Sequence, residues 1–506
     1  IYTLWHTLSL HDALPICHLD DALASARRAQ ELAPNLSHPQ MVLGFAYLMQ
    51  VKIEEAKEAF VKAIEFDQAA PLPRLGLGLA KIREGDLEAG RRDIEIAASL
   101  NPNSSIIRSY LGKAYYEEKR TNLDDREFDI AKELDPSDPT PYFYDAVNLQ
   151  SENRPVEALR NYEKAIELNE NRAVYRSSLQ LDSDLAARSA AVAQIYNNLG
   201  FGQRGLLESY SAVNADPTNF FAHRFLADTY ATLPRHEIAR VSELLQSQLL
   251  QPLNTTPIQP SLAESNLFLI SSLGPTQFSF SEFNNLMITR NRAAFLGSGL
   301  VGTKDTWAGE GILSGIYDKF SLSAGYKRFE TDGFRINNDQ EDEIATIFAQ
   351  LELTNKTSVQ AEYRYRDSER GYLQLRFDPD DFLPNYRENE ETDSWRLGLR
   401  HDFSPENIVL ANLTYQEKNF LQQSRPGAVF GPFGPSIELN ETKDEVEAIG
   451  GEFQYLFRTP YIHLVTGAGF FDIDMPRNTT TEISYPLPTF PPPPIGPGGT
   501  TETTII

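Results

Sequence analysis

Few residues in this sequence have the types and spacing that catalysis or metal binding requires. The segment "RFDPDDF" brings Asp378, Asp380 and Asp381 close together, and carboxylate oxygens in such a run can bind calcium. A solvated loop is the other explanation of this segment, and it is the one we favour. Ser298 and Ser314 have glycine neighbours, but both fall within expected strands, whereas the nucleophile of an α/β-hydrolase lies at a strand-to-helix turn.

Other catalytic and ligand-binding signatures are missing from the sequence. The eight histidines have no metal-ligand spacing, and no glycine-rich phosphate loop ends in Lys-Ser or Lys-Thr. Cys17 is the only cysteine, which rules out a disulfide framework or a cysteine metal site. The formal net charge of -25 argues against a nucleic-acid partner, which needs a basic surface. We therefore expect no enzyme activity, no cofactor and no metal.

Charged residues at regular spacing are the stronger functional signal. They occupy alternate positions in segments whose other positions are mostly apolar, and they are Glu362, Arg364, Arg366, Arg396, Arg400 and Glu452. If the apolar positions face lipid, these residues line a pore, where charged rings tune selectivity. Arginine is also suited to binding carboxylates or phosphates. The alternative, which carries more weight, is that opposite charges simply pair in a polar interior.

The segments that carry these charges are expected to be β-strands. From about residue 291, apolar and polar residues alternate with the period of two that is typical of half-buried strands. Short turns near 318–321, 354–357, 404–406 and 459–460 alternate with longer polar segments at about 331–342, 367–392, 420–443 and from 476 on. This sorting of connections by length is typical of a transmembrane barrel, with tight turns on one side and long loops on the other.

Aromatic residues near the strand ends favour the same interpretation. Phe320, Trp395, Phe403, Phe457 and Tyr461 could form the interfacial girdles of a barrel. We predict an incomplete antiparallel transmembrane β-barrel of about nine strands over residues 291–475, followed by a Pro/Gly/Thr-rich outer loop over 476–506. Because bacterial single-chain barrels have an even number of strands, we expect the chain to be cut inside that loop. A soluble antiparallel sandwich or barrel is the alternative, although it requires neither the sorted connections nor the aromatic ends.

The first half of the sequence repeats with a period of 34 residues. Pro34, Pro102 and Pro136 are separated by multiples of that period. The residues that carry the pattern are Leu43, Gly44, Tyr47, Ala56, Phe60, Ala63, Leu77, Gly78, Leu111, Gly112, Tyr115, Phe128, Ala131 and Pro136. The pattern resembles the tetratricopeptide repeat, a pair of packed helices. The resemblance implies an α-solenoid over residues 18–250, with a concave face that binds peptides or protein surfaces, and residues 251–290 are then a linker.

The first 17 residues are not expected to belong to the fold. The letters "LPIC" at Cys17 are similar to a lipoprotein anchor signal. However, residues 1–16 contain no Lys or Arg, and His6, His11 and Asp12 interrupt the apolar run that a signal peptide needs. The stretch "TLSLHDALPI" resembles instead the translation of a sequencing adapter. We therefore expect the native start of the protein to be missing.

The order of the two parts, repeats and then barrel, resembles that of the outer-membrane porins that export bacterial exopolysaccharides. The resemblance implies an α + β multidomain protein of the bacterial outer membrane, with its repeats in the periplasm. It also implies envelope-protein partners for the solenoid, lipid around the barrel and a polysaccharide as the exported polymer. No pore residue is carried over from that family to this chain. The alternative function is an interaction scaffold for envelope proteins that a barrel anchors and that transports nothing.

Overall fold

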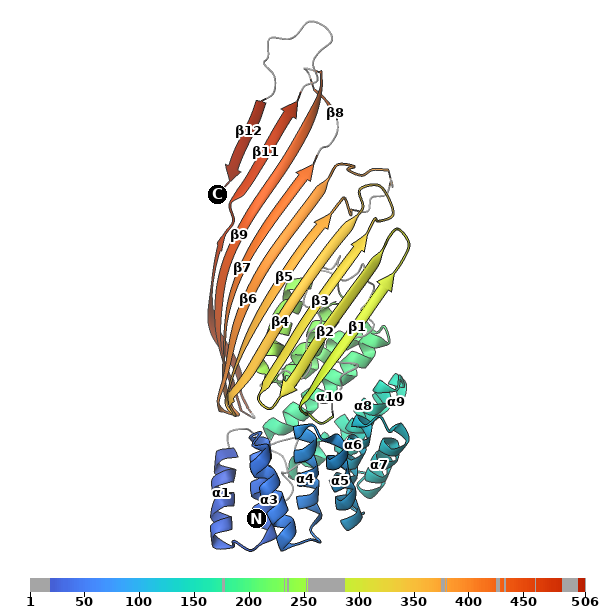
Figure 1. The fold of residues 1–506 in the computed structure, drawn as a ribbon, viewed down its shortest axis with the longest axis vertical. Coiled ribbons are helices and arrows are strands. Elements are labelled where there is room, and N and C mark those ends of the chain that lie inside the picture. Colours follow the sequence, from blue (N-terminus) through green and yellow to red (C-terminus); the bar gives the residue numbers. More distant parts are fainter. Residues whose placement is uncertain are drawn as a thin grey trace.

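The structure consists of a helical part followed by one large β-sheet (Figure 1). It is a computed structural model, and it describes residues 19–505 apart from 175–177, 232, 234–235, 252, 254–286, 375–377, 379, 425–427, 432–433, 460 and 485–498. The adapter-like stretch and most of the expected linker lie outside the described residues.

The helical part is an array of antiparallel hairpins. Within the described residues the helices are α1 (Leu19–Leu32), α2 (Ser37–Met49), α3 (Ile53–Phe66), α4 (Pro71–Glu84), α5 (Leu87–Leu100), α6 (Ser105–Glu117), α7 (Thr121–Leu134), α8 (Pro139–Ser151), α9 (Pro155–Glu167), α10 (Ser178–Asn198), α11 (Gly202–Ala215), α12 (Phe220–Ala231) and α13 (Glu237–Leu250). A 3-10 helix, η3 (Asn169–Val174), interrupts the regular array before the longer α10. None of the helices described here is both long enough and apolar enough to cross a membrane.

Local sequence sets the boundaries of several helices. Asp86 and Ser104 cap the N-termini of α5 and α6, where each side chain accepts a hydrogen bond from a backbone N–H of the first turn. Pro155 occupies the first turn of α9, where a backbone N–H has no partner within the helix. Gly85 ends α4 with φ at 119°, a left-handed conformation that favours glycine. These signals position the helices that pack as hairpins.

Small residues face aromatic rings between the paired helices. Gly44 lies against the ring of Phe60, and two periods later Gly112 lies against the ring of Phe128. Both phenylalanines are fully buried. Of the other residues in the 34-residue pattern, Tyr47 is half-buried and Pro136 is exposed just after α7, and the rest are buried, namely Leu43, Ala56, Ala63, Leu77, Gly78, Leu111, Tyr115 and Ala131.

The sheet is antiparallel throughout. Its strands are β1 (Arg292–Val301), β2 (Trp307–Tyr317), β3 (Phe320–Thr331), β4 (Gln340–Thr354), β5 (Thr357–Arg370), β6 (Arg387–Ser404), β7 (Asn407–Ser424), β8 (Ala428–Gly431), β9 (Gly434–Arg458), β10 (His463–Asp474), β11 (Arg477–Ser484) and β12 (Gly499–Ile505). Neighbours follow the order β1-β2-β3-β4-β5-β6-β7-β9-β11-β12, and β8 and β10 both pair with β9. Since β1 and β12 lie at opposite ends of this order, the sheet is open in the part of the chain that the structure describes.

The strands differ from the sequence prediction in number and length. The described residues form twelve strands, where we expected about nine. Two of them, β11 and β12, lie in the segment expected to be a loop, where threonine runs have high strand propensity. Strands β6, β7 and β9 continue into polar segments also expected to be loops. They can do so because the backbone ladder between strands does not require apolar side chains.

Candidate functional site

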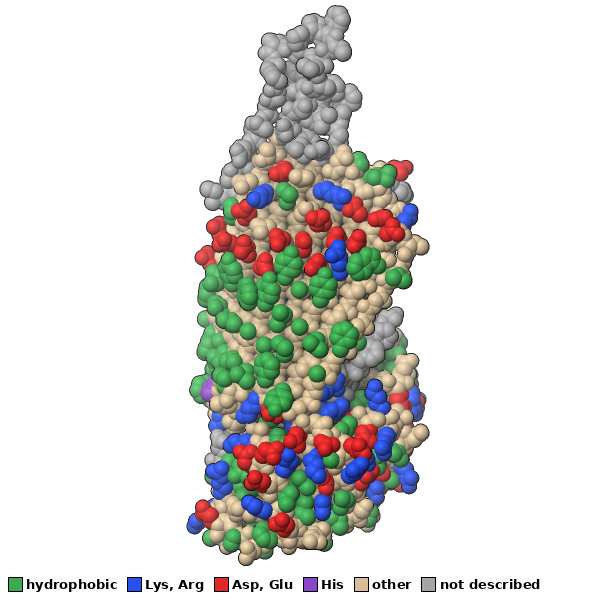
Figure 2. Space-filling view, viewed as in Figure 1, with side chains coloured by type: hydrophobic (Ala, Val, Ile, Leu, Met, Phe, Trp, Pro, Cys, Tyr) green, Lys and Arg blue, Asp and Glu red, His purple; other side chains and the backbone are tan. Residues whose placement is uncertain are grey.

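The two faces of the sheet differ in chemistry. We call outer the face on which three successive rows of side chains, aligned across β4, β5, β6, β7 and β9, are mostly apolar. The rows are Leu351, Val359, Leu399, Ala411 and Phe453, then Ala349, Ala361, Leu397, Leu413 and Gly451, then Ile347, Tyr363, Trp395, Tyr415 and Ile449. Large members such as Leu397 and Trp395 are more than half exposed. Figure 2 shows hydrophobic side chains gathered across the middle of this face.

The apolar rows of the outer face end in aromatic side chains on both sides. Toward the long loops, Tyr363 and Trp395 lie with ring centroids 4.3 Å apart. Toward the short turns, Phe320, Phe403 and Tyr461 are exposed. Beyond the Trp395 row the face becomes acidic, with Asp393, Glu417 and Glu447 in the next row and Glu343, Asp367, Glu391 and Glu445 in the one after it (Figure 2). The outer face is therefore an apolar band with an acidic margin toward the long loops.

The inner face is the opposite side of the sheet, and it carries the six charged residues proposed from the sequence. By register, Glu362, Arg364, Arg366, Arg396, Arg400 and Glu452 all lie on it. Glu362 and Arg396 stand opposite each other on β5 and β6 and form an ion pair of 3.2 Å. Arg400 pairs with Asp402 of its own strand at 2.7 Å. These arginines thus have carboxylate partners within the sheet.

Arg366 belongs to a larger charged group on the inner face. Its guanidinium is buried and lies 3.3 Å from Asp342 and 3.0 Å from Glu390. Glu390 also contacts Lys418 on β7 at 3.1 Å. Arg364 is opposite Ser394, and Glu452 is opposite Asn412. Glu362, Arg366, Arg396 and Arg400 therefore form ion pairs within the sheet. A pore-lining role for the six charged residues stays a prediction.

The C-terminal end of α13 lies against the inner face near the short turns. Arg400 donates a hydrogen bond to the backbone carbonyl of Leu250. The Nε2 of Gln350 donates to the carbonyl of Gln251 at 2.5 Å, and Arg396 reaches the side chain of Gln248 at 3.3 Å. The last carbonyls of a helix have no partners inside it and carry partial negative charge, so donors from the sheet satisfy them.

Apolar packing accompanies these hydrogen bonds. Leu249 and Leu250 form a buried cluster with Ile408, Leu410 and Leu456, which lie on the inner face of β7 and β9. Sequence reasoning missed this contact. A signal was present, since Leu410 and Leu456 occupy positions that the alternation assigns to polar side chains. Gly398 makes room for the contact, since a Cβ there would lie 2.6 Å from the side chain of Leu249.

A buried ion pair provides a further link between the helices and the sheet. Arg458, the last residue of β9, pairs with Asp216 just after α11, and both side chains are almost fully buried. Arg458 also donates to the carbonyl of Leu179 in α10 at 3.4 Å. In Figure 1 the green helices that follow α10 lie behind the sheet, in agreement with these contacts. The helical array is thus joined to the strands through their turn ends.

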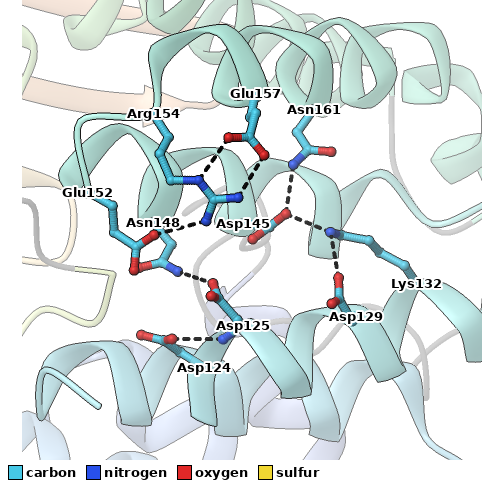
Figure 3. A network of polar contacts seen from close by, with 10 residues as sticks. All are labelled: Asp124, Asp125, Asp129, Lys132, Asp145, Asn148, Glu152, Arg154, Glu157 and Asn161. Atoms are coloured by element: carbon cyan, nitrogen blue, oxygen red, sulfur yellow. Dashed lines mark hydrogen bonds and ion pairs between the residues drawn. The ribbon is translucent and has the colours of Figure 1, made fainter. Parts of the chain in front are cut away.

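A polar network connects α7, α8 and α9 in the helical array (Figure 3). Asp145 of α8 accepts hydrogen bonds from Lys132 and Asn161, both at 2.6 Å. Asn148 of α8 donates to Asp125 of α7 at 2.7 Å. Figure 3 shows that these side chains lie between the helices and point toward one another. The network therefore ties three helices together.

Asp124, at the edge of this network, is fully buried. Its Oδ1 accepts the backbone N–H of Asp125 at 2.7 Å, and its Oδ2 has no hydrogen-bond partner among the described residues. Burial raises the pKa of Asp124 to about 7, with further contributions from Asp125, Glu152 and Asp145. Burial also raises the pKa of Asp145, against the opposing effect of Lys132. The network therefore holds carboxylates that bind protons more readily than exposed ones.

The acidic segment near Asp378 forms a local turn. The Oδ1 of Asp378 accepts the backbone N–H of Asp380 at 3.0 Å. Among the residues that the structure describes, no group of three or more His, Cys, Asp or Glu side chains is arranged to hold a metal ion.

Comparisons with known proteins give partial matches to helical proteins. No protein-family model matches the sequence. No curated protein matches it either. The Cut9–Hcn1 hetero-tetramer of the APC/C gives a TM-score of 0.41 at 16% identity, over 47% of this chain and 44% of that one. Pseudomonas aeruginosa pilF gives a TM-score of 0.34 at 14% identity, over 49% of this chain and 96% of that one.

A third match is YrrB, described as a TPR protein with an unusual peptide-binding site, with a TM-score of 0.27 at 19% identity over 38% of this chain and 94% of that one. The chain thus spans less than half the length of the Cut9–Hcn1 chain that it matches. TM-scores this low do not establish function, and the architecture rests on the helices and strands themselves.

Proposed function

We propose that the sheet is part of the wall of an outer-membrane β-barrel and that the helical repeats form a scaffold for other proteins on the periplasmic side. The observation that carries the proposal is the division between the two faces of β4 to β9. The outer face presents continuous apolar rows, whereas the inner face presents paired charges and amides. A soluble sheet would normally bury its apolar face, but here that face is the exposed one.

The dimensions of the apolar band support this proposal. From Trp395 to Phe403 the strand rises about 26 Å, at about 3.3 Å per residue. At a tilt of about 40° this corresponds to a height of about 20 Å, close to the ~25 Å apolar band of outer-membrane barrels. The short turns lie on the side of the helices, as Figure 1 shows. In such barrels the short turns face the periplasm, which would place the repeats there as well.

Export of a polymer such as an exopolysaccharide is the transport function that we propose for this barrel. Its support is the polar inner face, which has amides and paired charges at the height of the apolar band, for example Gln360 and the pair of Glu362 with Arg396. Neutral amides and paired charges form hydrogen bonds with sugar hydroxyls without imposing a strong net charge. The solenoid would then hold envelope proteins close to the pore.

A non-transporting scaffold is the second candidate, and one observation favours it. The end of α13 covers part of the inner face near the turns, through the cluster of Leu249 and Leu250 with Leu410. A rigid contact at that place would narrow the pore. The barrel would then serve as an anchor for the repeats.

Membrane insertion and transport can be tested separately. For insertion, full-length chain with Trp5 and Trp307 changed to phenylalanine is reconstituted with brominated lipids, so that only Trp395 fluoresces. We expect strong quenching of Trp395, and fluorescence equal to that in unbrominated lipid would reject the membrane proposal. For transport, the full-length protein with its barrel closed should show, in planar bilayers, a conductance that a polysaccharide blocks. A quenched but non-conducting protein would favour the anchored scaffold.

A further inference from the structure

The segment Met287–Asn291, which leads directly into β1, lies against the helical array. Its residues contact α4 and α6 and the neighbouring α7 and α8. The contacts involve positions that are equivalent in successive repeats, since Arg83 near the end of α4 and Glu117 at the end of α6 are one period apart. The segment therefore crosses from one repeat to the next.

Glu117 is the centre of this contact. Its carboxylate accepts the backbone N–H of Met287 at 2.7 Å and that of Ile288 at 3.2 Å, and it pairs with the guanidinium of Arg290. The Glu117 side chain is only 2% exposed. A buried carboxylate that has two backbone donors and a guanidinium is well compensated, and each charge-assisted bond is stronger than a neutral one. Two of the three interactions are with the main chain, so they do not depend on side-chain identity.

Arg83 binds the end of the segment. Its backbone carbonyl accepts the N–H of Asn291 at 2.9 Å, and its guanidinium donates to the Oδ1 of Asn291 at 3.1 Å. The same guanidinium donates to the carbonyl of Asp318 in the β2–β3 turn at 2.6 Å. Gly85 leaves space here, since a Cβ at that position would lie 3.1 Å from the carbonyl oxygen of Asn291.

The two apolar residues of the segment fill separate hydrophobic positions. Met287 is 5% exposed and is clustered with Phe128 and Tyr144, against the partly buried Phe143 and Val147. Ile288 is 3% exposed and belongs to the hydrophobic core of the first repeats. Because both side chains are almost completely removed from water, these two residues supply most of the apolar contribution to the contact.

We propose that this surface of α4, α6 and α8 is a peptide-recognition groove whose resident occupant is the chain's own Met287–Asn291. A partner protein would displace it with an extended segment that has two adjacent apolar residues followed two positions later by arginine. The groove would recognise the peptide in three ways. Its hydrophobic positions hold the two apolar side chains, and the Glu117 carboxylate binds the main-chain N–H groups and the arginine. The backbone carbonyl of Arg83 accepts a further main-chain N–H. The proposal goes beyond the function proposed above, and it holds whether or not the sheet lies in a membrane.

An external peptide has to compete with Met287–Asn291, because that segment is covalently part of the same chain. A tethered segment acts at an effective concentration of the order of millimolar, so an external peptide of equal intrinsic affinity binds the intact chain weakly. Weakening the resident segment should therefore increase the affinity for an external peptide. If the contact served only to fasten the sheet to the repeats, a free peptide would not displace the resident segment from the intact chain.

The test uses the full chain and a fluorescein-labelled peptide with the sequence of residues 285–291, followed by fluorescence anisotropy. We expect the double variant Met287→Ala/Arg290→Ala to bind the peptide at least tenfold more tightly than the wild-type chain does. Adding Glu117→Gln to that variant should weaken binding at least tenfold, whereas Glu84→Gln, an exposed glutamate of α4, should not change it. Equal binding by wild type and double variant, or no effect of Glu117→Gln, would overturn the proposal.

A second measurement on the wild-type chain guards against misfolding of the variants. Hydrogen exchange of the Met287 and Ile288 amides is followed with and without a large excess of the unlabelled peptide. Displacement should accelerate exchange at these two amides at least fivefold and leave the α4–α5 hairpin unchanged. Unchanged exchange at saturating peptide would refute displacement, independently of any variant.

Discussion

Replacing Asp124 by asparagine is expected to remove part of the pH dependence of the stability of the helical repeats. Asp124 is fully buried in α7, and its pKa is raised from 3.8 to about 7, chiefly by burial. In the unfolded chain the same carboxyl titrates near its ordinary value. Between these two pH values the folded state binds more protons than the unfolded state. The free energy of unfolding therefore falls as the pH rises from about 4 to about 7.

The magnitude follows from the pKa difference between the two states. The difference of about three pKa units, at about 1.4 kcal/mol per unit, sets an upper limit of about 4 kcal/mol on the stability lost above pH 7. Asparagine has nearly the same shape and does not ionise. Its Oδ1 can keep the hydrogen bond with the Asp125 N–H, which Asp124 now accepts at 2.7 Å. We therefore expect Asp124→Asn to be more stable than wild type at pH 8, by up to about 4 kcal/mol, and of similar stability at pH 4.

The assay is urea unfolding of the full chain, followed by circular dichroism at 222 nm at several values between pH 4 and pH 8. This signal reports mainly on the helices. Glu133→Gln, at an exposed position of the same helix, serves as the control and should retain the wild-type pH dependence. Asp125 and Asp145 also have raised pKa values, so some pH dependence should remain in Asp124→Asn. Parallel curves for wild type and Asp124→Asn across the whole range would refute the reasoning.

Three further substitutions test the packing and the two interfaces. Gly112→Ala would place a Cβ 2.7 Å from the Phe128 ring and should destabilise the repeats by about 1–3 kcal/mol in thermal unfolding. Gly202→Ala serves as the control and should have a small effect, because a Cβ there would meet no atom within 4 Å. Leu397→Lys on the outer face should reduce the stability of the reconstituted protein by about 2–4 kcal/mol if that face contacts lipid. Asn412→Lys on the inner face, opposite Glu452, should not reduce it. Equal effects of the two substitutions would argue for a sheet in water. Arg458→Ala leaves the buried Asp216 without its guanidinium and should cost about 3–5 kcal/mol, with faster hydrogen exchange in α11. Arg477→Ala removes an exposed partner of Asp444 and should have a much smaller effect on stability.

Periodicity in the sequence was sufficient to predict helical hairpins in the first half of the chain and antiparallel strands in the second half. The 34-residue spacing that includes Gly44 and Gly112 corresponds to helical hairpins, and the alternation around Glu362 and Arg396 corresponds to strands with one polar face. Both patterns are local, because each reflects how a single element divides its side chains between two environments. The extra strands β11 and β12 were missed because proline and glycine nearby suggested a loop, although the threonine runs favour strands.

The contacts between the two parts could not be predicted in the same way. Leu410 and Leu456 depart from the alternation of their strands, but only the position of α13 explains why. No pattern in the sequence singles out Glu117, because its role depends on a segment 170 positions later in the chain. Such contacts depend on tertiary placement, which no periodic pattern of one element encodes.

The helical array is attached to the sheet at two separate places, and this limits how the two parts can move. Arg83 and Glu117 bind the segment before β1 and the β2–β3 turn, near one edge of the sheet. The end of α13 and Asp216 contact β4, β6, β7 and β9, which lie farther along the strand order. Two attachments this far apart along the strand order prevent the array from pivoting about either one. A peptide that displaced Met287–Asn291 would leave the hydrogen bond of Arg83 to the carbonyl of Asp318 at the first attachment, so rotation of the array about α13 would be less restricted but not free. Binding of a partner to the repeats would in this way be transmitted to the turn ends of the first strands.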